Sequence, residues 1–133
     1  MKVFLLDTNA VSILFKPDHT LYAQCASMVS GNQLFISFMT RAELALWPRQ
    51  NHWGPKRAAE LRKHMELFTT LLADEQTCIH WADTVSENRS AGHPMTTADA
   101  WIAATAIQRD LPLVTADYRD FEHVRTLTLV PVR

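Results

Sequence analysis

Apolar and polar positions alternate along the chain in a way that predicts strands separated by helices. Apolar runs at residues 2–6, 33–38, 111–117 and 127–132 predict buried strands, and residues 77–81 are a candidate short strand. Segments with helical periodicity are residues 10–15, 21–29, 40–47, 56–72, 82–90 and 96–109. We expect Pro48 to end one of these helices at Trp47. This alternation predicts an α/β fold with a mainly parallel central sheet flanked by helices.

Length and composition fit one globular domain that spans residues 1–133. The chain is 47% hydrophobic and 20% charged, with a formal net charge of -1, so it has no overall basic field that would indicate nucleic acid. The apolar run before Asp7 is too short for a signal peptide or a membrane span, which predicts a cytoplasmic protein with no membrane association. Cys25 and Cys78 lack CxxC spacing and are interpreted as reduced thiols.

Four acidic residues stand where the predicted topology brings chain segments together. Asp7 and Asp117 end the strands at 2–6 and 111–117, and Glu43 opens the helix after the second strand. Asp99 opens the helix that runs back to strand 111–117. Because ligands bind at the carboxyl edge of a parallel sheet, we expect all four side chains to lie at that edge.

A purely structural interpretation competes for each of these acids. Thr96-x-x-Asp99 and Thr40-x-x-Glu43 both match a capping box, and an acid in the first helical turn also favours the helix dipole. Asp commonly begins the turn that follows a strand, which would explain Asp7 and Asp117. Convergence of all four acids at one edge of the sheet instead favours a role in metal binding or catalysis.

Carboxylates gathered in this way repel one another, by about 4 kcal/mol for a close pair near a protein surface. Either some are protonated or a cation lies among them. Oxygen-only ligands suit Mg²⁺ or Mn²⁺. A carboxylate-bound Mg²⁺ that keeps several waters supplies a hydroxide-like nucleophile and neutralises a phosphate in its transition state, so the acids indicate phosphodiester hydrolysis.

Three segments carry a resemblance to a known family: "LLDTNAVSILF", "ISFMTRAELAL" and "TTADAWIAATAIQRDLPLVTADYRDFEHV". Together they resemble the PIN-domain ribonucleases, particularly the VapC toxins of type II VapBC toxin–antitoxin systems. The resemblance implies a single PIN domain over residues 1–133, with a PIN-like three-layer α/β/α fold. It also implies a metal-dependent endoribonuclease whose catalytic and metal-binding acids are Asp7, Glu43, Asp99 and Asp117.

The resemblance further implies one or two Mg²⁺ or Mn²⁺ ions and a set of supporting residues. Thr8 and Asn9 resemble the family's supporting polar pair, and Thr115 its hydroxyl before the last acid. Some relatives rely on the acid three residues later, here Asp120, so Asp117 and Asp120 are alternatives for the fourth acid. The implied partners are an RNA substrate (tRNA or ribosomal RNA), a VapB-type antitoxin that inserts a basic side chain among the acids, and a second copy of the chain.

Three other functions were weighed against this one. A non-catalytic binding module with the PIN fold would not need all four acids, and a nuclease that acts on DNA is not distinguished by sequence. A phosphoacceptor receiver domain needs a lysine at the end of a late strand, and none of the lysines is so placed: Lys2, Lys16, Lys56 and Lys63.

The remaining polar and aromatic residues have ordinary interpretations. The histidines lack zinc-ligand spacing, and Lys56, Arg57, Arg62 and Lys63 are interpreted as a solvated helix face. Trp47, Trp81 and Trp101 are expected to be core or interface anchors. In the loop predicted at 48–55, the candidates for contact with RNA or antitoxin are Arg49, His52 and Trp53.

Overall fold

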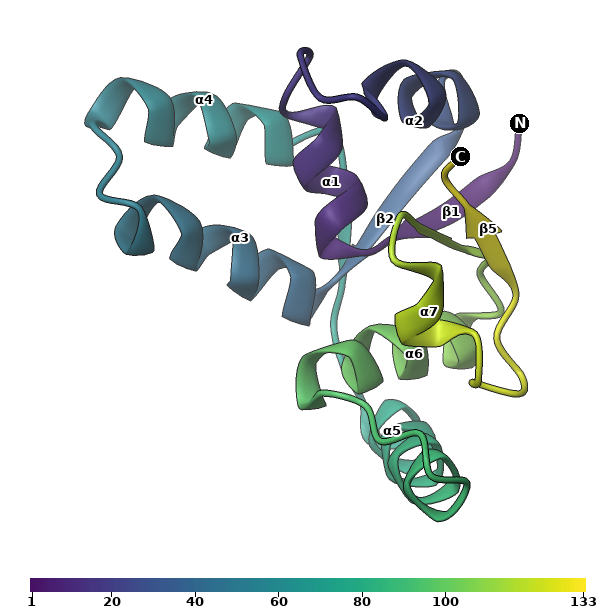
Figure 1. The fold of residues 1–133 in the computed structure, drawn as a ribbon. Helices are drawn as coiled ribbons and strands as arrows, with labels where there is room; N and C mark the ends of the chain where they lie inside the picture. The colour runs from purple at the N-terminus through teal and green to yellow at the C-terminus, as the bar shows by residue number, and fades with distance from the viewer.

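The computed structural model describes residues 1–133 and contains one sheet of five strands (Figure 1). Every neighbouring pair is parallel, and the strand order is β3-β2-β1-β4-β5, so β1 lies at the centre. The strands are β1 (Val3–Leu6), β2 (Gln33–Ser37), β3 (Thr69–Leu71), β4 (Leu113–Thr115) and β5 (Leu129–Pro131). The predicted parallel sheet is confirmed, and it is parallel throughout.

Helices cover both faces of this sheet. They are α1 (Thr8–Leu14), α2 (Tyr22–Val29), α3 (Phe38–Gln50), α4 (Pro55–Met65), α5 (Glu75–Ser90), α6 (Thr97–Arg109) and α7 (Tyr118–Phe121). In Figure 1, α1 and α2 lie above the sheet, and α5 and α6 lie below it. The predicted α/β/α arrangement of three layers is therefore confirmed.

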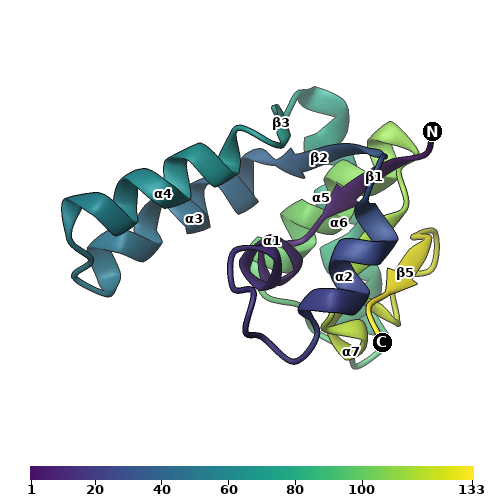
Figure 2. The ribbon, with the colours of Figure 1, turned by 90° about the horizontal axis from the view of Figure 1, so that it is seen from above.

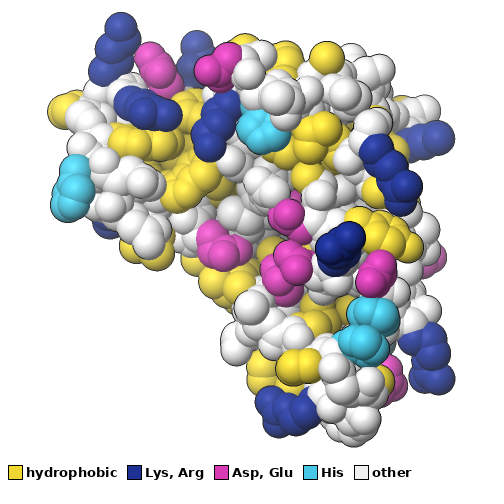
Figure 3. Space-filling view, in the orientation of Figure 1, with side chains coloured by type: hydrophobic (Ala, Val, Ile, Leu, Met, Phe, Trp, Pro, Cys, Tyr) yellow, Lys and Arg dark blue, Asp and Glu magenta, His cyan; other side chains and the backbone are white.

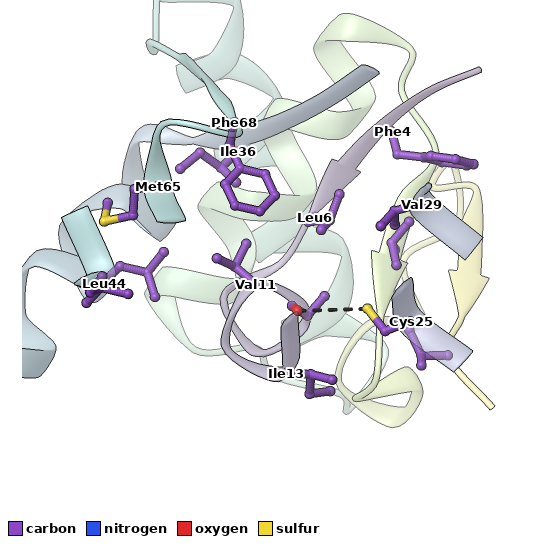
Figure 4. Packing of buried hydrophobic residues seen from close by; sticks show 14 residues of the cluster. Phe4, Leu6, Val11, Ile13, Cys25, Val29, Ile36, Leu44, Met65 and Phe68 are labelled. Carbon is purple, nitrogen blue, oxygen red and sulfur yellow. Dashed lines mark hydrogen bonds between the residues drawn. The ribbon is translucent and has the colours of Figure 1, made fainter. Parts of the chain in front are cut away.

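Alternation along β1 divides the core between the two faces. Phe4 and Leu6 pack with residues of α1, α2 and α4, including the buried Val11 and Cys25 (Figure 4). Leu5, between them in sequence, points to the other face and packs in a cluster with Ile102 of α6. Both faces of β1 are buried, which explains why residues 4–6 are all apolar.

Two helices project from the body of the domain. Figures 1 and 2 show α3 and α4 as an antiparallel hairpin that extends to one side of the sheet. We call residues 38–65 the arm. It is anchored at its base by Leu44, Leu61 and Met65, which are buried in the cluster on the α1 face of the sheet. The arm therefore places side chains beyond the edge of the sheet while its base remains packed.

The prediction that Pro48 ends a helix at Trp47 is wrong. Helix α3 continues through Pro48 to Gln50. Proline removes its own N–H from the helical ladder and crowds the preceding turn, but the turn after it is still closed by the Asn51 N–H, which donates to the Trp47 carbonyl at 3.0 Å. The loop predicted at 48–55 is correspondingly shorter.

Two further boundaries differ from the prediction. The helix predicted at 56–72 ends at Met65, and residues 69–71 add the edge strand β3, which contains the β-branched Thr69 and Thr70. Residues 77–81 are helical, because Asp74 and Thr77 form a capping box that starts α5 two residues earlier. The Asp74-x-x-Thr77 spacing is the sequence signal for this helix start.

No helix of the structure has the length and apolar character that crossing a membrane requires.

Candidate active site

Asp7 lies where the central strand becomes a helix. It is the N-cap of α1, and its Oδ1 accepts a hydrogen bond from the Ala10 N–H at 2.7 Å. Its Oδ2 accepts from the Thr115 hydroxyl at 2.6 Å. Only 3% of the residue is exposed, and this burial raises the pKa of Asp7 to about 7, although both hydrogen bonds oppose the shift. Asp7 therefore does more than cap a helix, because a capping role alone needs no such burial.

Glu43 reaches the same edge from α3. The helix begins at Phe38 with Ser37 as its N-cap, so the capping box predicted for Thr40 and Glu43 is wrong. Instead, the Thr8 hydroxyl donates to Glu43 Oε1 at 2.7 Å and lies 3.1 Å from the Thr40 hydroxyl. Thr8, the first residue of α1, thus positions a carboxylate that is 35 residues away in sequence.

Asp99 opens α6, and its carboxylate is not used by the cap. Thr96 is the N-cap, and its hydroxyl accepts from the Asp99 N–H at 3.1 Å. The reciprocal bond of a capping box, in which the Thr96 N–H would donate to the Asp99 carboxylate, is absent. Partial burial raises the pKa of Asp99, and the nearby carboxylates Asp120, Glu43 and Asp117 add to the shift. The inward-facing acid predicted from the helical pattern therefore has no cationic partner, and only the Thr96 hydroxyl opposes the rise in its pKa.

Asp117 and Asp120 follow β4 on the other side of Asp7. The Thr115 hydroxyl that donates to Asp7 also accepts from the Asp117 N–H at 2.9 Å. Asn9 Nδ2 donates to Asp117 Oδ2 at 2.7 Å. Asp120 lies one helical turn further on and borders a neighbouring cavity, together with Asp99. Of the two alternatives for the fourth acid, Asp117 is the one that shares a cleft with the other three.

A cleft of about 300 Å³ brings the four predicted acids together. Its wall is formed by Asp7, Thr8, Asn9, Ser12, Glu43, Leu46, Trp47, Gln50, Asp99, Ile102 and Asp117. Figure 3 shows acidic side chains gathered at the centre of the molecule, where the arm meets the body. No lysine or arginine lines the cleft, and neither of the two ion pairs in the structure involves these acids. The charge of the cleft is left unbalanced by the protein.

The donor set suits a hard divalent cation. All four acids offer carboxylate oxygens, and no nitrogen or sulfur ligand is among them. No three His, Cys, Asp or Glu side chains converge as a ready metal cage. Mg²⁺ does not require one, since it keeps several waters and binds through one or two carboxylates. The chemistry of the cleft therefore fits Mg²⁺ or Mn²⁺ bound partly through water.

Sequence reasoning did not assign several residues that border these acids. Gln50 and Ser12 line the cleft, and neither belongs to a motif. In the neighbouring cavity the rings of His93 and His123 stack with centroids 3.5 Å apart, 30 residues apart in sequence. Nothing in the spacing of the histidines signals that contact, because the loop before α6 and the segment after α7 meet only in the folded chain.

Replacing Thr115 should shift the titration of Asp7. Thr115→Val removes the hydroxyl that donates to Asp7 Oδ2, so the pKa of Asp7 should rise further, by roughly one to two units for a lost bond to a charged group. Carbon-detected NMR titration of the metal-free protein measures this directly. Thr115→Ser should restore the lower pKa. Thr105→Val removes another buried hydroxyl, one that donates to Trp101, and should leave Asp7 unchanged; equal shifts in both valine variants would contradict the assignment.

Comparison with known proteins identifies the family to which this chain belongs. Residues 4–127 match the PIN domain family. Over 128 residues the chain is 30% identical to ribonuclease VapC1 of Haemophilus influenzae, covering 94% of each protein. The chain therefore belongs to the PIN-domain family and, within it, to the VapC ribonucleases.

Solved structures agree on the fold. DNA-bound VapBC from Salmonella typhimurium has a chain that matches with a TM-score of 0.84 and 25% identity, covering 100% of both chains. VapBC2 from Rickettsia felis, bound to a DNA fragment from its promoter, matches with a TM-score of 0.85 at 18% identity, covering 97% of this chain and 98% of that one. The predicted relationship to the PIN-domain and VapC family is confirmed.

Proposed function

We propose that the protein is a metal-dependent endoribonuclease toxin that hydrolyses phosphodiester bonds of RNA in the cytoplasm. The observation that carries the proposal is the cleft in which Asp7, Glu43, Asp99 and Asp117 lie together without a cationic partner. Membership of the VapC ribonucleases supports RNA as the substrate. A protein of net charge -1 binds a polyanion at such a cleft only if positive charge is supplied there.

Each residue of the cleft has a defined task in this proposal. The four carboxylates would hold Mg²⁺ or Mn²⁺, directly or through water. When bound, the ion lowers the pKa of a water and neutralises charge on the scissile phosphate. Thr8, Asn9 and Thr115 hold Glu43, Asp117 and Asp7, respectively, in fixed orientations through single hydrogen bonds. Hydrolysis adds one water across one P–O bond, so water and phosphate must meet in a defined geometry. Carboxylates that are already fixed before RNA binds provide that geometry.

We also propose a VapB-type antitoxin as partner and a homodimer as the assembled form. The structures of similar chains are VapBC complexes, which supports the first partner. A basic side chain inserted among the four acids would relieve the same repulsion as a metal ion and would exclude the metal. Sedimentation of the purified protein tests the dimer.

The function is tested by incubating purified protein with total cellular RNA in Mg²⁺, in Mn²⁺ and in EDTA. We expect discrete cuts in either metal and none in EDTA, because without a cation the carboxylates repel the phosphate. Sequencing of the new ends would identify tRNA or ribosomal RNA as the target. A single-stranded DNA of the same sequence as the cut RNA, added in parallel, should remain intact.

Two outcomes would contradict the proposal. Cutting of the DNA with intact RNA would assign the site to a different nucleic acid. Intact RNA in the presence of a metal that binds, as measured by calorimetry, would indicate a PIN fold that binds without catalysis.

A further inference from the structure

Two tryptophans of the arm form an aromatic surface beside the acidic cleft. The rings of Trp47 and Trp53 lie 5.7 Å apart at 48°, and Phe15 stacks on Trp53 at 6.0 Å. Both indoles are only partly buried. Trp47 also lines the acidic cleft, on the face of α3 that carries Glu43. The aromatic surface is therefore continuous with the cleft wall.

A cation lies over each of the two indole rings. Lys16 Nζ is 4.9 Å from the centre of the Trp47 ring, and the guanidinium carbon of Arg57 is 3.9 Å from the centre of the Trp53 ring. Neither cation forms a salt bridge with a carboxylate. Arg57, interpreted from sequence as part of a solvated helix face, instead lies over an aromatic ring. We call Lys16, Trp47, Trp53 and Arg57 the cation–aromatic platform.

Charge is distributed unevenly around this platform. The arm carries six lysines and arginines but only two acids, a net charge of +4, whereas the whole chain has a net charge of -1. Figure 3 shows dark blue side chains around an apolar hollow on the arm and the magenta acids beside it. The positive arm would thus attract a polyanion and bring it next to the acidic cleft. There the carboxylates repel a phosphate unless a metal ion neutralises its charge.

We propose that the cation–aromatic platform is a subsite for single-stranded RNA beside the scissile phosphate. Lys16 binds a backbone phosphate next to the cleft, and the planar guanidinium of Arg57, backed by Trp53, takes a stacked base. Cations combined with aromatic faces are the surfaces on which unpaired nucleic acid binds, and bases stack on arginine planes as they do on aromatic rings. This inference rests on the proposed ribonuclease function.

RNA fits the platform better than a peptide does. A peptide gains most from apolar pockets, and the arm offers one in a groove of about 580 Å³ between α3 and α4. This groove contains Leu44, Ala45, Leu61 and Met65, but three arginines and the Trp53 of the platform also line it. On the platform, by contrast, the apolar rings are covered by unpaired positive charge. That combination favours a partner with negative charge and flat surfaces in alternation, which describes a single strand of RNA.

The test is RNA binding as a function of salt, measured by fluorescence anisotropy in an Asp99→Asn background with Mg²⁺, so that no cutting is required. The probe is a single-stranded RNA that extends past the cleft on both sides. Lys16→Gln should weaken binding several-fold and reduce the slope of log affinity against log salt by about 0.7, the value for one lost phosphate contact on a single strand. Arg57→Gln should weaken binding to a similar extent, and Arg57→Lys should restore the charge but not the stacking.

The control is Arg109→Gln, which removes an exposed cation at the end of α6 opposite to Asp99. It should bind RNA with the parent affinity and slope, and circular dichroism melting should show all variants folded. Lys16→Gln and Arg57→Gln with the parent affinity and slope would overturn the platform while leaving the nuclease proposal intact. Loss of antitoxin binding with unchanged RNA binding would also overturn it and assign the surface to the protein partner. A wild-type protein that cuts no RNA would instead defeat the proposed function itself.

Discussion

Asp99→Asn should reduce RNA cleavage by at least about 100-fold, the largest effect expected from any single substitution in the cleft. The variant keeps the shape and the Thr96 cap but removes the charge of an acid whose pKa burial and three nearby carboxylates raise, with only the Thr96 hydroxyl opposing the shift. In the proposed function, a cation offsets the charge of this carboxylate. Single-turnover cleavage of a mapped RNA in Mg²⁺ measures the loss directly.

A matched control exists on the same helix. Asp110→Asn makes the same chemical change at the other end of α6, where Asp110 is the C-cap with a φ of 51°. Asparagine tolerates this left-handed conformation well, so the control should fold and cleave normally. Asp99→Asn should also be at least as stable as the wild type without metal, because burial of its charge is unfavourable. Retention of full activity by Asp99→Asn would remove the central member of the proposed site.

Topology explains why the fold and the position of the acids could be predicted from sequence. The apolar run at Phe4, Leu5 and Leu6 does not by itself distinguish a buried strand from a buried helix. Several such runs, each followed by a helical pattern, nevertheless indicate a parallel sheet covered by helices on both faces. Once the sheet is parallel, Asp7 and Asp117 are at its carboxyl edge regardless of the details of packing. The structure brings both into one cleft with Glu43 and Asp99.

Local signals account for what was not predicted. Residues 69–71 follow a helical pattern without a stop signal, and only pairing with β2 selects the strand. The Ser37 cap starts α3 earlier than Thr40, so Glu43 lies in the second turn and is positioned by Thr8 rather than by a cap. The stacking of Arg57 on Trp53 depends on how the turn of the arm closes, which no periodicity encodes.

Stability in the absence of metal should fall as pH rises from about 4 to about 7. Asp7 has a pKa raised from 3.8 to about 7 in the folded protein, so in that window the folded state binds more protons than the unfolded one. Its contribution is intact below pH 3.8 and is lost as pH passes 7, by on the order of 4 kcal/mol if the whole shift is realised. Denaturant titrations in EDTA across this range measure the change.

Comparison with Asp7→Asn isolates this contribution from the other titrating groups. Asparagine retains an oxygen that accepts from the Ala10 N–H, so the cap survives, but the atom that accepts from the Thr115 hydroxyl becomes a donor. That loss does not vary with pH, so the pH-dependent part of the difference reports the ionisation of Asp7. The variant should gain stability relative to the wild type as pH rises. A difference that stays constant with pH would show that Asp7 ionises without cost.

Mg²⁺ should weaken the pH dependence of stability in the wild type and not in Asp7→Asn. An ion that binds the ionised carboxylates stabilises the folded state by mass action, and it competes with the proton for Asp7. Stability of the wild type at pH 8 should therefore rise with Mg²⁺ concentration, and the loss between pH 4 and pH 7 should shrink. Burial makes the ionised form of Asp7 unfavourable in the metal-free protein, and a bound cation would offset that free energy. We therefore expect the cleft to bind a cation before it binds RNA.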